Sequence, residues 1–329
     1  MSTISLKEEI QQKVGDLRQY GSVRRIILDD GPERNVRALA FSTGGGLDFW
    51  VLVDRSLDLG PVWYRGMPVA WQSPAGFRNP ALHNSEQDGG RGFDRSFSGF
   101  LVTCGLDHIR QPSDADPLHG RLPFSPASVL ACGESWDREE PVLFCEGEVT
   151  QWRYGAEGLR LRRRIEAPIG KCEVRITDVV ENLTSRKSRH QLLYHFNLGY
   201  PAISAGTEVH LGTEVILAPI AFPDLSAESE STCHAAAQHP VGRCTVRSPV
   251  LGGSFFQTEF AFPTENLPWI QIWRDLRPRV GVLAIEPCTS EKIGLGQSGE
   301  GRPLEAGEHR EYHVEISMSE KTGSTAPTR

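Results

Sequence analysis

The stretch LDFWVLVD, residues 47–54, places an apolar side chain at every second position. Leu47, Phe49, Val51 and Val53 therefore share one face of an extended chain, because successive side chains of a β-strand point to opposite faces. The residues between them face the other way and include the charged Asp48. This pattern predicts a strand with one face in a hydrophobic core.

The same alternation recurs along the chain and predicts an all-β protein. It is found in CEVRITDV (residues 172–179) and in the runs 159–165 and 280–285. Thirty-three glycines and 22 prolines are scattered between such runs, as expected for many strands joined by turns. Neither a strand followed by a G-x-G-x-x-G motif nor a P-loop occurs. We therefore expect a large antiparallel sandwich, whose sheet can present a concave outer face to a flat polar ligand such as a sugar.

The two ends of the chain differ from this pattern. A short amphipathic helix is predicted over residues 5–18, with Ser5 and Glu8 forming a capping box. Its apolar face is formed by Leu6, Ile10, Val14 and Leu17. The predicted organisation is an N-terminal helical segment (1–22), a β-sandwich domain (23–318) and a polar tail (319–329).

Composition argues against several classes of partner. The formal net charge of −7 and the pI of about 5.8 disfavour nucleic acid as a partner. In the basic run at residues 160–164, Arg160 and Arg162 alternate with Leu159 and Leu161, which predicts the solvent face of a strand. The seven cysteines include no C-x-x-C pair, so no zinc or redox spacing is visible. No signal peptide and no apolar run of about 20 residues is evident, so we expect a cytoplasmic protein without a membrane partner.

Three short stretches carry groups suited to proton transfer. They are LHGR (118–121), YHFN (194–197) and IEP (285–287), which contain His119, His195 and Glu286. Two imidazoles and one carboxylate are the minimum set for moving protons near neutral pH. Each histidine could equally be a satisfied core or surface residue, whereas a carboxylate that ends a buried strand is costly unless it is paired or functional. Two histidines and a glutamate could also form a zinc or iron site.

Five stretches along most of the chain resemble one known superfamily. They are DRSLDLG (54–60), SFSGFLVTCGL (96–106), LHGR, LLYHFNLGYP (192–201) and IEP. In this order they are similar to the aldose 1-epimerase superfamily, and specifically to its DUF4432 branch. The resemblance implies a galactose mutarotase-like β-supersandwich with its site on the concave face and no metal or other cofactor. It also implies catalytic roles for His119, His195 and Glu286.

Some positions depart from the family's pattern. His195 stands two residues before Asn197, whereas the mutarotase histidine stands four before its asparagine; an offset of two keeps the side chain on the same face of a strand. The mutarotase aspartate that contacts sugar hydroxyls has no clear equivalent, and the segment 265–275, with Gln271 and Trp273, is expected in its place. Tryptophan faces stack on sugar C–H surfaces, although a core role is equally open.

Further candidates for substrate binding are Asn197 and two arginines. Arg95 and Arg121 could clamp sugar hydroxyls or a carboxylate, or could form surface ion pairs. The expected ligand is a small-molecule carbohydrate, and the N-terminal helix offers a surface for a homodimer.

The resemblance implies interconversion of sugar anomers. Glu286 would take the proton of the C1 hydroxyl, His195 would protonate the ring oxygen, and His119 would hold the ring. Two alternatives remain open: a lyase or isomerase that acts on a keto-sugar with the same base, and a non-catalytic carbohydrate-binding module.

Overall fold

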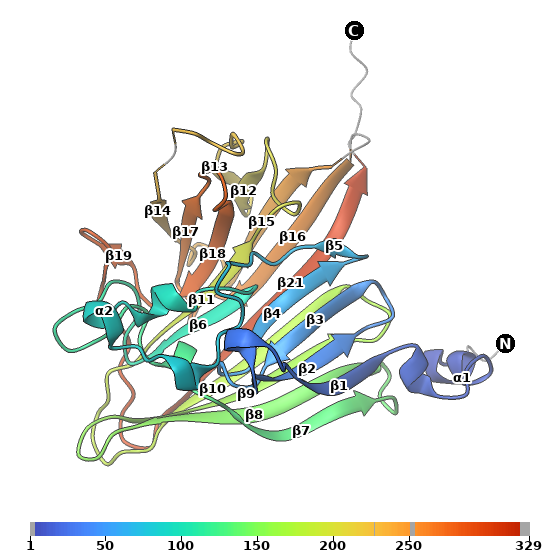
Figure 1. The fold of residues 1–329 in the computed structure, drawn as a ribbon, viewed down its shortest axis with the longest axis horizontal. Helices are drawn as coiled ribbons and strands as arrows, with labels where there is room; N and C mark the ends of the chain where they lie inside the picture. The colour runs from blue at the N-terminus through green and yellow to red at the C-terminus, as the bar shows by residue number, and fades with distance from the viewer. Residues whose placement is uncertain (1–3, 227, 251–253, 323–329) are drawn as a thin grey trace, which may run out of the picture.

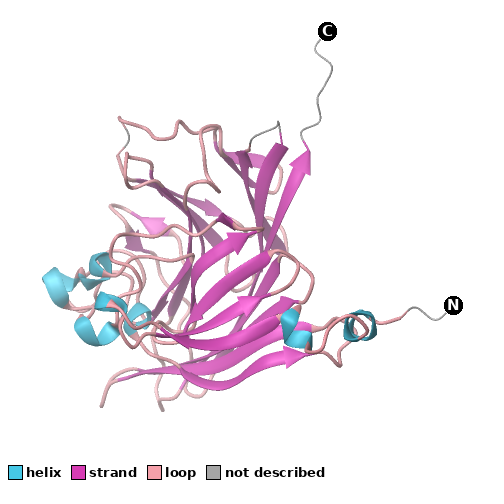
Figure 2. Ribbon diagram, turned by 45° about the vertical axis from the view of Figure 1, so that its right-hand side comes forward, coloured by secondary structure: helices cyan, strands magenta, loops and turns pink. Residues whose placement is uncertain are grey.

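The computed structural model describes residues 4–226, 228–250 and 254–322 and shows two stacked layers of β-sheet (Figures 1 and 2). Every ladder between the named strands is antiparallel. The all-β prediction and the sandwich architecture are therefore confirmed.

One layer is a single nine-stranded sheet that spans the molecule. Its strands, in spatial order, are β13 (Glu214–Leu217), β12 (Glu208–Leu211), β15 (Val241–Pro249), β16 (Ser254–Pro263), β21 (His309–Thr322), β10 (Glu173–Asn182), β9 (Gly158–Pro168), β8 (Val142–Trp152) and β7 (Ser128–Ser135).

The opposing layer consists of two five-stranded sheets. The N-terminal one has the order β1 (Ser22–Ile27), β2 (Arg37–Ser42), β3 (Leu47–Leu52), β4 (Asp58–Tyr64) and β5 (Met67–Pro68). The other, called the site sheet below, has the order β14 (Glu230–Ala235), β17 (Trp269–Asp275), β18 (Val282–Cys288), β11 (Gln191–Leu198) and β6 (Leu101–Leu106).

Small elements complete the described part of the chain. They are the helices α1 (Leu6–Gln11) and α2 (Gln87–Gly90), the hairpin of β19 (Lys292–Ile293) and β20 (Gln297–Ser298), and 3₁₀ turns at Leu17–Gln19, Gly31–Glu33, Pro80–Leu82, Gly92–Arg95 and Leu122–Phe124.

Aromatic side chains join the layers across one core. The ring of Phe196 in β11 lies 5.0 Å from that of Phe260 in β16, between centroids. The ring of Tyr64 in β4 lies 5.3 Å from that of Phe256, also in β16. Both five-stranded sheets therefore pack on the same face of the large sheet, and burial of these rings contributes much of the stability.

The period-two pattern decides which side chains of β11 leave the core. Tyr194 and Phe196 point inward, where the Tyr194 hydroxyl donates a hydrogen bond of 2.7 Å to Asp178. His195 and Asn197 consequently point to the outer face of the site sheet. That face is not open to solvent, because every residue of β6, β11 and β18 is buried. In Figure 1, α2 and the β19 hairpin lie at the same end of the molecule as these strands.

The basic run on β9 divides between surface and interior. Arg162 is exposed and Arg160 is half-buried beside Glu181, as predicted for a solvent face. Arg163 points into the core, where its guanidinium binds Asp58 at 2.9 Å and Asp178 at 2.7 Å. A buried arginine with two buried carboxylates is a structural ion cluster and not a phosphate-binding patch.

The N-terminal helix is shorter than predicted. Helix α1 covers only Leu6–Gln11, although the capping box between Ser5 and Glu8 is present. Asp16 caps a separate 3₁₀ turn at Leu17–Gln19 by accepting a hydrogen bond from the Arg18 amide at 2.9 Å. Gly15 and Asp16 are poor helix formers, so the predicted helix does not continue through them.

Both predicted boundaries shift slightly. Strand β1 begins at Ser22, and β21 extends to Thr322, so residues 319–322 belong to a paired strand and not to a tail. The rest of the predicted tail, 323–329, lies outside the described residues. All seven cysteines are free thiols. Within the described ranges, no helix is both long and apolar enough to cross a membrane.

Candidate active site

A cavity of about 530 Å³ lies on the outer face of the site sheet. Its floor is formed by side chains of the neighbouring strands β11, β17 and β18, namely His195, Gln271, Trp273 and Glu286. Its walls come from the segment around α2, from His119, and from the β19 hairpin. Residues from distant parts of the chain therefore converge on one space large enough for a small ligand.

At its centre, His195 and Glu286 form a close pair. Their strands are adjacent, with Phe196 opposite Ile285, so the two side chains occupy neighbouring positions on the same face. His195 Nε2 lies 3.4 Å from Glu286 Oε1. Glu286 is fully buried, and its Oε1 has no hydrogen-bond partner within the protein. A buried carboxyl oxygen without a partner is costly, so this atom is poised to bind a ligand or transfer a proton.

Asn197 fixes the tautomer of His195. Its Nδ2 donates to the carbonyl oxygens of Gly99 and His195, both at 3.0 Å, which orients its Oδ1 toward the imidazole. Oδ1 can only accept, so His195 Nδ1, at 2.6 Å, carries the proton. In the neutral ring, Nε2 is then a free acceptor that faces Glu286. Asn197, predicted to bind substrate, thus orients the histidine from outside the cavity lining.

Burial shifts the two ionisable groups in opposite directions. Desolvation raises the pKa of Glu286 to about 8, although the nearby Arg110 cation acts against this shift. Desolvation lowers the pKa of His195 to about 4, although the hydrogen bond that the ring donates to Asn197 acts against this shift. Near pH 7 the carboxyl is therefore protonated and the imidazole neutral, because a low-dielectric site disfavours both charged forms. The pair consists of one proton donor and one proton acceptor.

Arg110 and Gln271 hold the carboxyl in place. Gln271 Nε2 donates to Glu286 Oε2 at 2.7 Å, and Arg110 Nε donates to Gln271 Oε1 at 2.9 Å. Arg110 is buried, has a φ of 70°, and also donates to the Ser290 carbonyl at 2.7 Å. Sequence reasoning missed Arg110, because its motif-free loop gives no sign that its left-handed backbone aims it inward.

His119 lies beside the pair, as predicted. Its ring centroid is 5.5 Å from that of His195, and its Nδ1 has no partner within the protein. Burial lowers the pKa of His119 well below its usual value of 6.5, so the ring is neutral. The residue has a φ of 61°, and Gly120 follows at 76°, where a Cβ would lie 2.4 Å from the Gly105 carbonyl oxygen. A strained backbone stabilised by packing is common at functional sites.

Trp273 contributes its indole to the floor of the cavity. Its ring centroid lies 5.7 Å from that of His195, and its Nε1 donates to Ser229 Oγ at 2.8 Å. Its indole is half-buried, so its surface can contact a ligand. Both Gln271 and Trp273, predicted for the site, therefore line it.

The two predicted arginine clamps lie elsewhere. Arg95 is exposed and donates to Asp88 at 2.8 Å. Arg121 binds Glu86 at 3.1 Å and lies 3.7 Å from Asp107 and Asp116. Neither arginine lines the cavity, so the prediction that they contact substrate finds no support. Each of the two arginines forms ion pairs with carboxylates that lie near it in space, and residue type alone does not predict such pairs.

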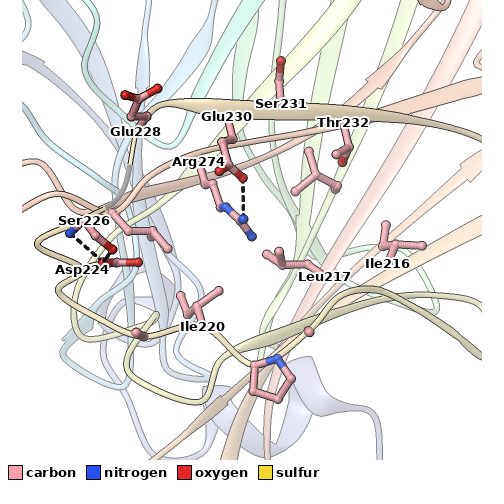
Figure 3. Close-up of a pocket in the computed structure, with 15 residues that line it drawn as sticks. Ile216, Leu217, Ile220, Asp224, Ser226, Glu228, Glu230, Ser231, Thr232 and Arg274 are labelled. Carbon is pink, nitrogen blue, oxygen red and sulfur yellow. Dashed lines mark hydrogen bonds and ion pairs between the residues drawn. The ribbon is translucent and has the colours of Figure 1, made fainter.

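A second cavity, of about 670 Å³, lies on the opposite face of β14 and β17 (Figure 3). Its lining combines apolar side chains such as Ile220 with the ion pair of Arg274 and Glu230. Figure 3 shows Ser231 pointing away from this space, toward the other face. No histidine is among its lining residues, all of which belong to the described ranges, so it lacks a donor–acceptor pair like that of His195 and Glu286. Among described residues, no group of three or more His, Cys, Asp or Glu is arranged to hold a metal ion.

Comparison with known proteins gives one family and one fold. The family described as "Domain of unknown function (DUF4432)" matches residues 33–318. No curated protein sequence matches the chain.

Among solved structures, the fold resembles that of a Klebsiella pneumoniae protein provisionally named an aldose 1-epimerase, with a TM-score of 0.81 and 20% identity over 94% of this chain and 86% of that one. It also resembles a Lactobacillus acidophilus galactose 1-epimerase, with a TM-score of 0.55 and 11% identity over 91% and 98% of the two chains. A galactose mutarotase-like protein from Clostridium acetobutylicum scores 0.55 at 14% identity over 92% and 98%. The galactose mutarotase-like fold is thereby shown.

Proposed function

We propose that this chain, which belongs to the DUF4432 family, interconverts the anomers of a sugar or sugar derivative by general acid–base catalysis. One observation carries the proposal: a buried carboxyl oxygen without a partner lies 3.4 Å from the free nitrogen of a histidine, at the floor of a ligand-sized cavity. The fold shared with aldose 1-epimerases supports the same reaction class by analogy.

The reaction needs one acceptor and one donor at neighbouring oxygens of the sugar. His195 Nε2 accepts the proton of the C1 hydroxyl while the Glu286 carboxyl gives its proton to the ring oxygen. The C1–ring oxygen bond breaks and a C1 carbonyl forms. After rotation about C1–C2, the ring oxygen attacks the other face of the carbonyl, and both protons return. No net proton is gained or lost, so no co-reactant is required.

This distribution of roles is the reverse of that implied by the family resemblance, which made Glu286 the base. The raised pKa of Glu286 and the lowered pKa of His195 support it, because each group already holds the required protonation state near pH 7. Ring closure uses the two groups in the opposite sense, so both serve as acid and base in one cycle.

The neighbouring residues suit binding of a sugar ring. The half-buried Trp273 offers an indole face for sugar C–H groups. The free Nδ1 of His119 can bond a hydroxyl, and its strained backbone holds it toward the cavity.

The direct test is anomer exchange in a panel of aldoses and sugar derivatives. Freshly dissolved pure anomers are followed by optical rotation, and the exchange rate at equilibrium by magnetisation-transfer NMR. For at least one sugar, the protein should accelerate exchange, and Glu286→Gln and His195→Ala should each reduce the rate by about 10²–10⁴. Glu259→Gln is the matched control, because Glu259 pairs with Arg243 on the nine-stranded sheet.

Two results would contradict the proposal. One is a sugar that binds without faster exchange, as expected of a carbohydrate-binding module. The other is turnover of a keto-sugar together with no effect on any aldose, as expected of a lyase or isomerase that uses the same base.

A further inference from the structure

Lys292 brings an uncompensated positive charge to the cavity. It extends from β19 and donates to the carbonyl oxygen of Ser231 at 2.9 Å and to its Oγ at 2.6 Å. An ammonium has three hydrogens to donate, so one remains. Among the residues that the structure describes, no carboxylate lies within 4.0 Å of this ammonium.

The remaining charges of the lining are compensated or fully engaged. Asp94 pairs with Arg91 at 2.9 Å, and Glu230 pairs with Arg274. Arg110 directs all three of its nitrogens at protein acceptors. Glu286 is uncharged near pH 7, because burial raises its pKa to about 8. Lys292 thus combines a charge that has no carboxylate partner with a hydrogen left to donate, whereas Arg91 is paired with Asp94 and the nitrogens of Arg110 are all engaged.

Two serine side chains line the cavity near this edge of the sheet, and one of them bonds this ammonium. Ser229 Oγ accepts from Trp273 Nε1 at 2.8 Å, and Ser231 Oγ accepts from Lys292. Each oxygen is therefore occupied as an acceptor, and each hydroxyl proton is available to donate. Ser229 and Ser231 are two residues apart, line the cavity together, and lie on the same edge of the site sheet. One ammonium and two hydroxyls form a set of donors suited to an acidic oxygen pair.

This set of donors lies at one end of the cavity and the catalytic pair at the other. Ser231 is on β14 and Glu286 on β18, two strand spacings apart across β17. Neighbouring strands are about 4.8 Å apart, so the separation across the sheet is about 10 Å. A six-membered sugar ring can bridge such a distance when its anomeric hydroxyl bonds one end and a carboxylate carried on C5, across the ring oxygen from C1, bonds the other.

We propose that the substrate is a sugar acid whose carboxylate binds Lys292, Ser229 and Ser231 while its anomeric centre lies at His195 and Glu286. The inference rests on the proposed function, since it assigns the substrate class of the same site. A carboxylate, with one negative charge, matches this one available ammonium. The second charge of a phosphate dianion would meet only Arg91, which pairs with Asp94, and Arg110, whose nitrogens are all engaged by protein acceptors.

Matched pairs of sugars test this directly. D-galacturonate is compared with D-galactose, D-glucuronate with D-glucose, and glucose 6-phosphate serves as the dianionic probe. Binding is measured by titration calorimetry and saturation-transfer NMR. For at least one pair, the acid should bind at least tenfold more tightly than the neutral sugar. Lys292→Met should reduce that preference to threefold or less without weakening the neutral sugar, and Lys292→Arg should retain it.

Lys171→Met is the matched control, because Lys171 pairs with Glu140 on the other layer of the sandwich. The inference is overturned if neither acid is preferred, if Lys292→Met leaves the preference intact, or if glucose 6-phosphate binds more tightly than both acids. Anomer exchange separates this inference from the proposed function. Lys292-dependent binding of an acid without exchange would refute the reaction and keep the substrate class. Exchange of neutral sugars together with no Lys292-dependent preference for either acid would keep the reaction and refute the substrate class.

Discussion

Replacement of Glu286 by glutamine should change the pH dependence of stability as well as activity. Glutamine keeps the shape of the side chain but does not ionise. In the folded protein the pKa of Glu286 is raised from its usual value of 4.5 to about 8. Between these two values the unfolded chain has lost the proton that the folded chain keeps. A group with a raised pKa in the folded state contributes stability that is lost as pH rises toward the folded value.

The magnitude follows from the width of a suitable pH window. His195 has a pKa lowered to about 4 from a usual 6.5, so between these values its ionisation makes the unfolding free energy rise with pH, opposite to the effect of Glu286. Above pH 6.5, His195 no longer changes the unfolding free energy with pH. From pH 6.5 to 8, only Glu286 of these two residues contributes, and it lowers the unfolding free energy by about 1.4 kcal/mol per pH unit. Over these 1.5 units, the wild-type protein should lose about 2 kcal/mol of unfolding free energy relative to Glu286→Gln.

The assay is urea denaturation of both proteins at pH 6.5, 7, 7.5 and 8, with fluorescence and circular dichroism as probes. The difference between the two proteins cancels the contributions of other titrating groups. Glu259→Gln serves again as the control, and it should follow the wild type because Glu259 forms a surface pair with Arg243. Parallel stability curves for wild type and Glu286→Gln would refute the argument that burial keeps this carboxyl protonated.

Three further outcomes follow from the same contacts. Arg110→Met should lower kcat, because it removes the hydrogen bond that holds Gln271 in place. It should also move the alkaline limb of the pH–rate profile above pH 8, because it removes a cation that lowers the pKa of Glu286. A lower kcat with an unmoved limb would contradict this. Arg95→Ala should leave turnover within about twofold, since its exposed ion pair lies outside the cavity lining, and a large loss of activity would place it in the site after all. Arg163→Met should cost about 3–5 kcal/mol in chemical denaturation, because it leaves buried carboxylates without their cation; a cost below 1 kcal/mol would show that the cluster is not needed.

Much of the fold follows from local patterns. The alternation in residues 47–54 corresponds to β3, and the run at residues 159–165 lies within β9. Period two also assigned His195 and Asn197 to the face opposite Tyr194 and Phe196, which the structure bears out. The pattern failed at residues 5–18, where helical spacing continued past Gly15 although the helix ends at Gln11. Apolar spacing marks a face, but it does not show that each turn is held by tertiary contacts.

For the site, the sequence singled out His119, His195 and Glu286, and the structure brings all three to one cavity. The predicted substrate arginines, Arg95 and Arg121, form ion pairs outside the lining of this cavity, and such pairs depend on which carboxylate lies nearby in space. Arg121 is taken by Glu86 and its neighbours, whereas Arg110 reaches Gln271 from a left-handed turn.

The sequence by itself therefore determined which side chains share a strand face and which chemical groups are available for proton transfer, since both depend on residue type and spacing. Only the tertiary structure decided the protonation of the pair. Burial of Glu286 and His195 against each other, with Asn197 and Gln271 beside them, comes from three neighbouring strands of one sheet, β11, β17 and β18. Desolvation and hydrogen bonding, which set a pKa, depend on that three-dimensional environment and have no counterpart in the order of residues along the chain.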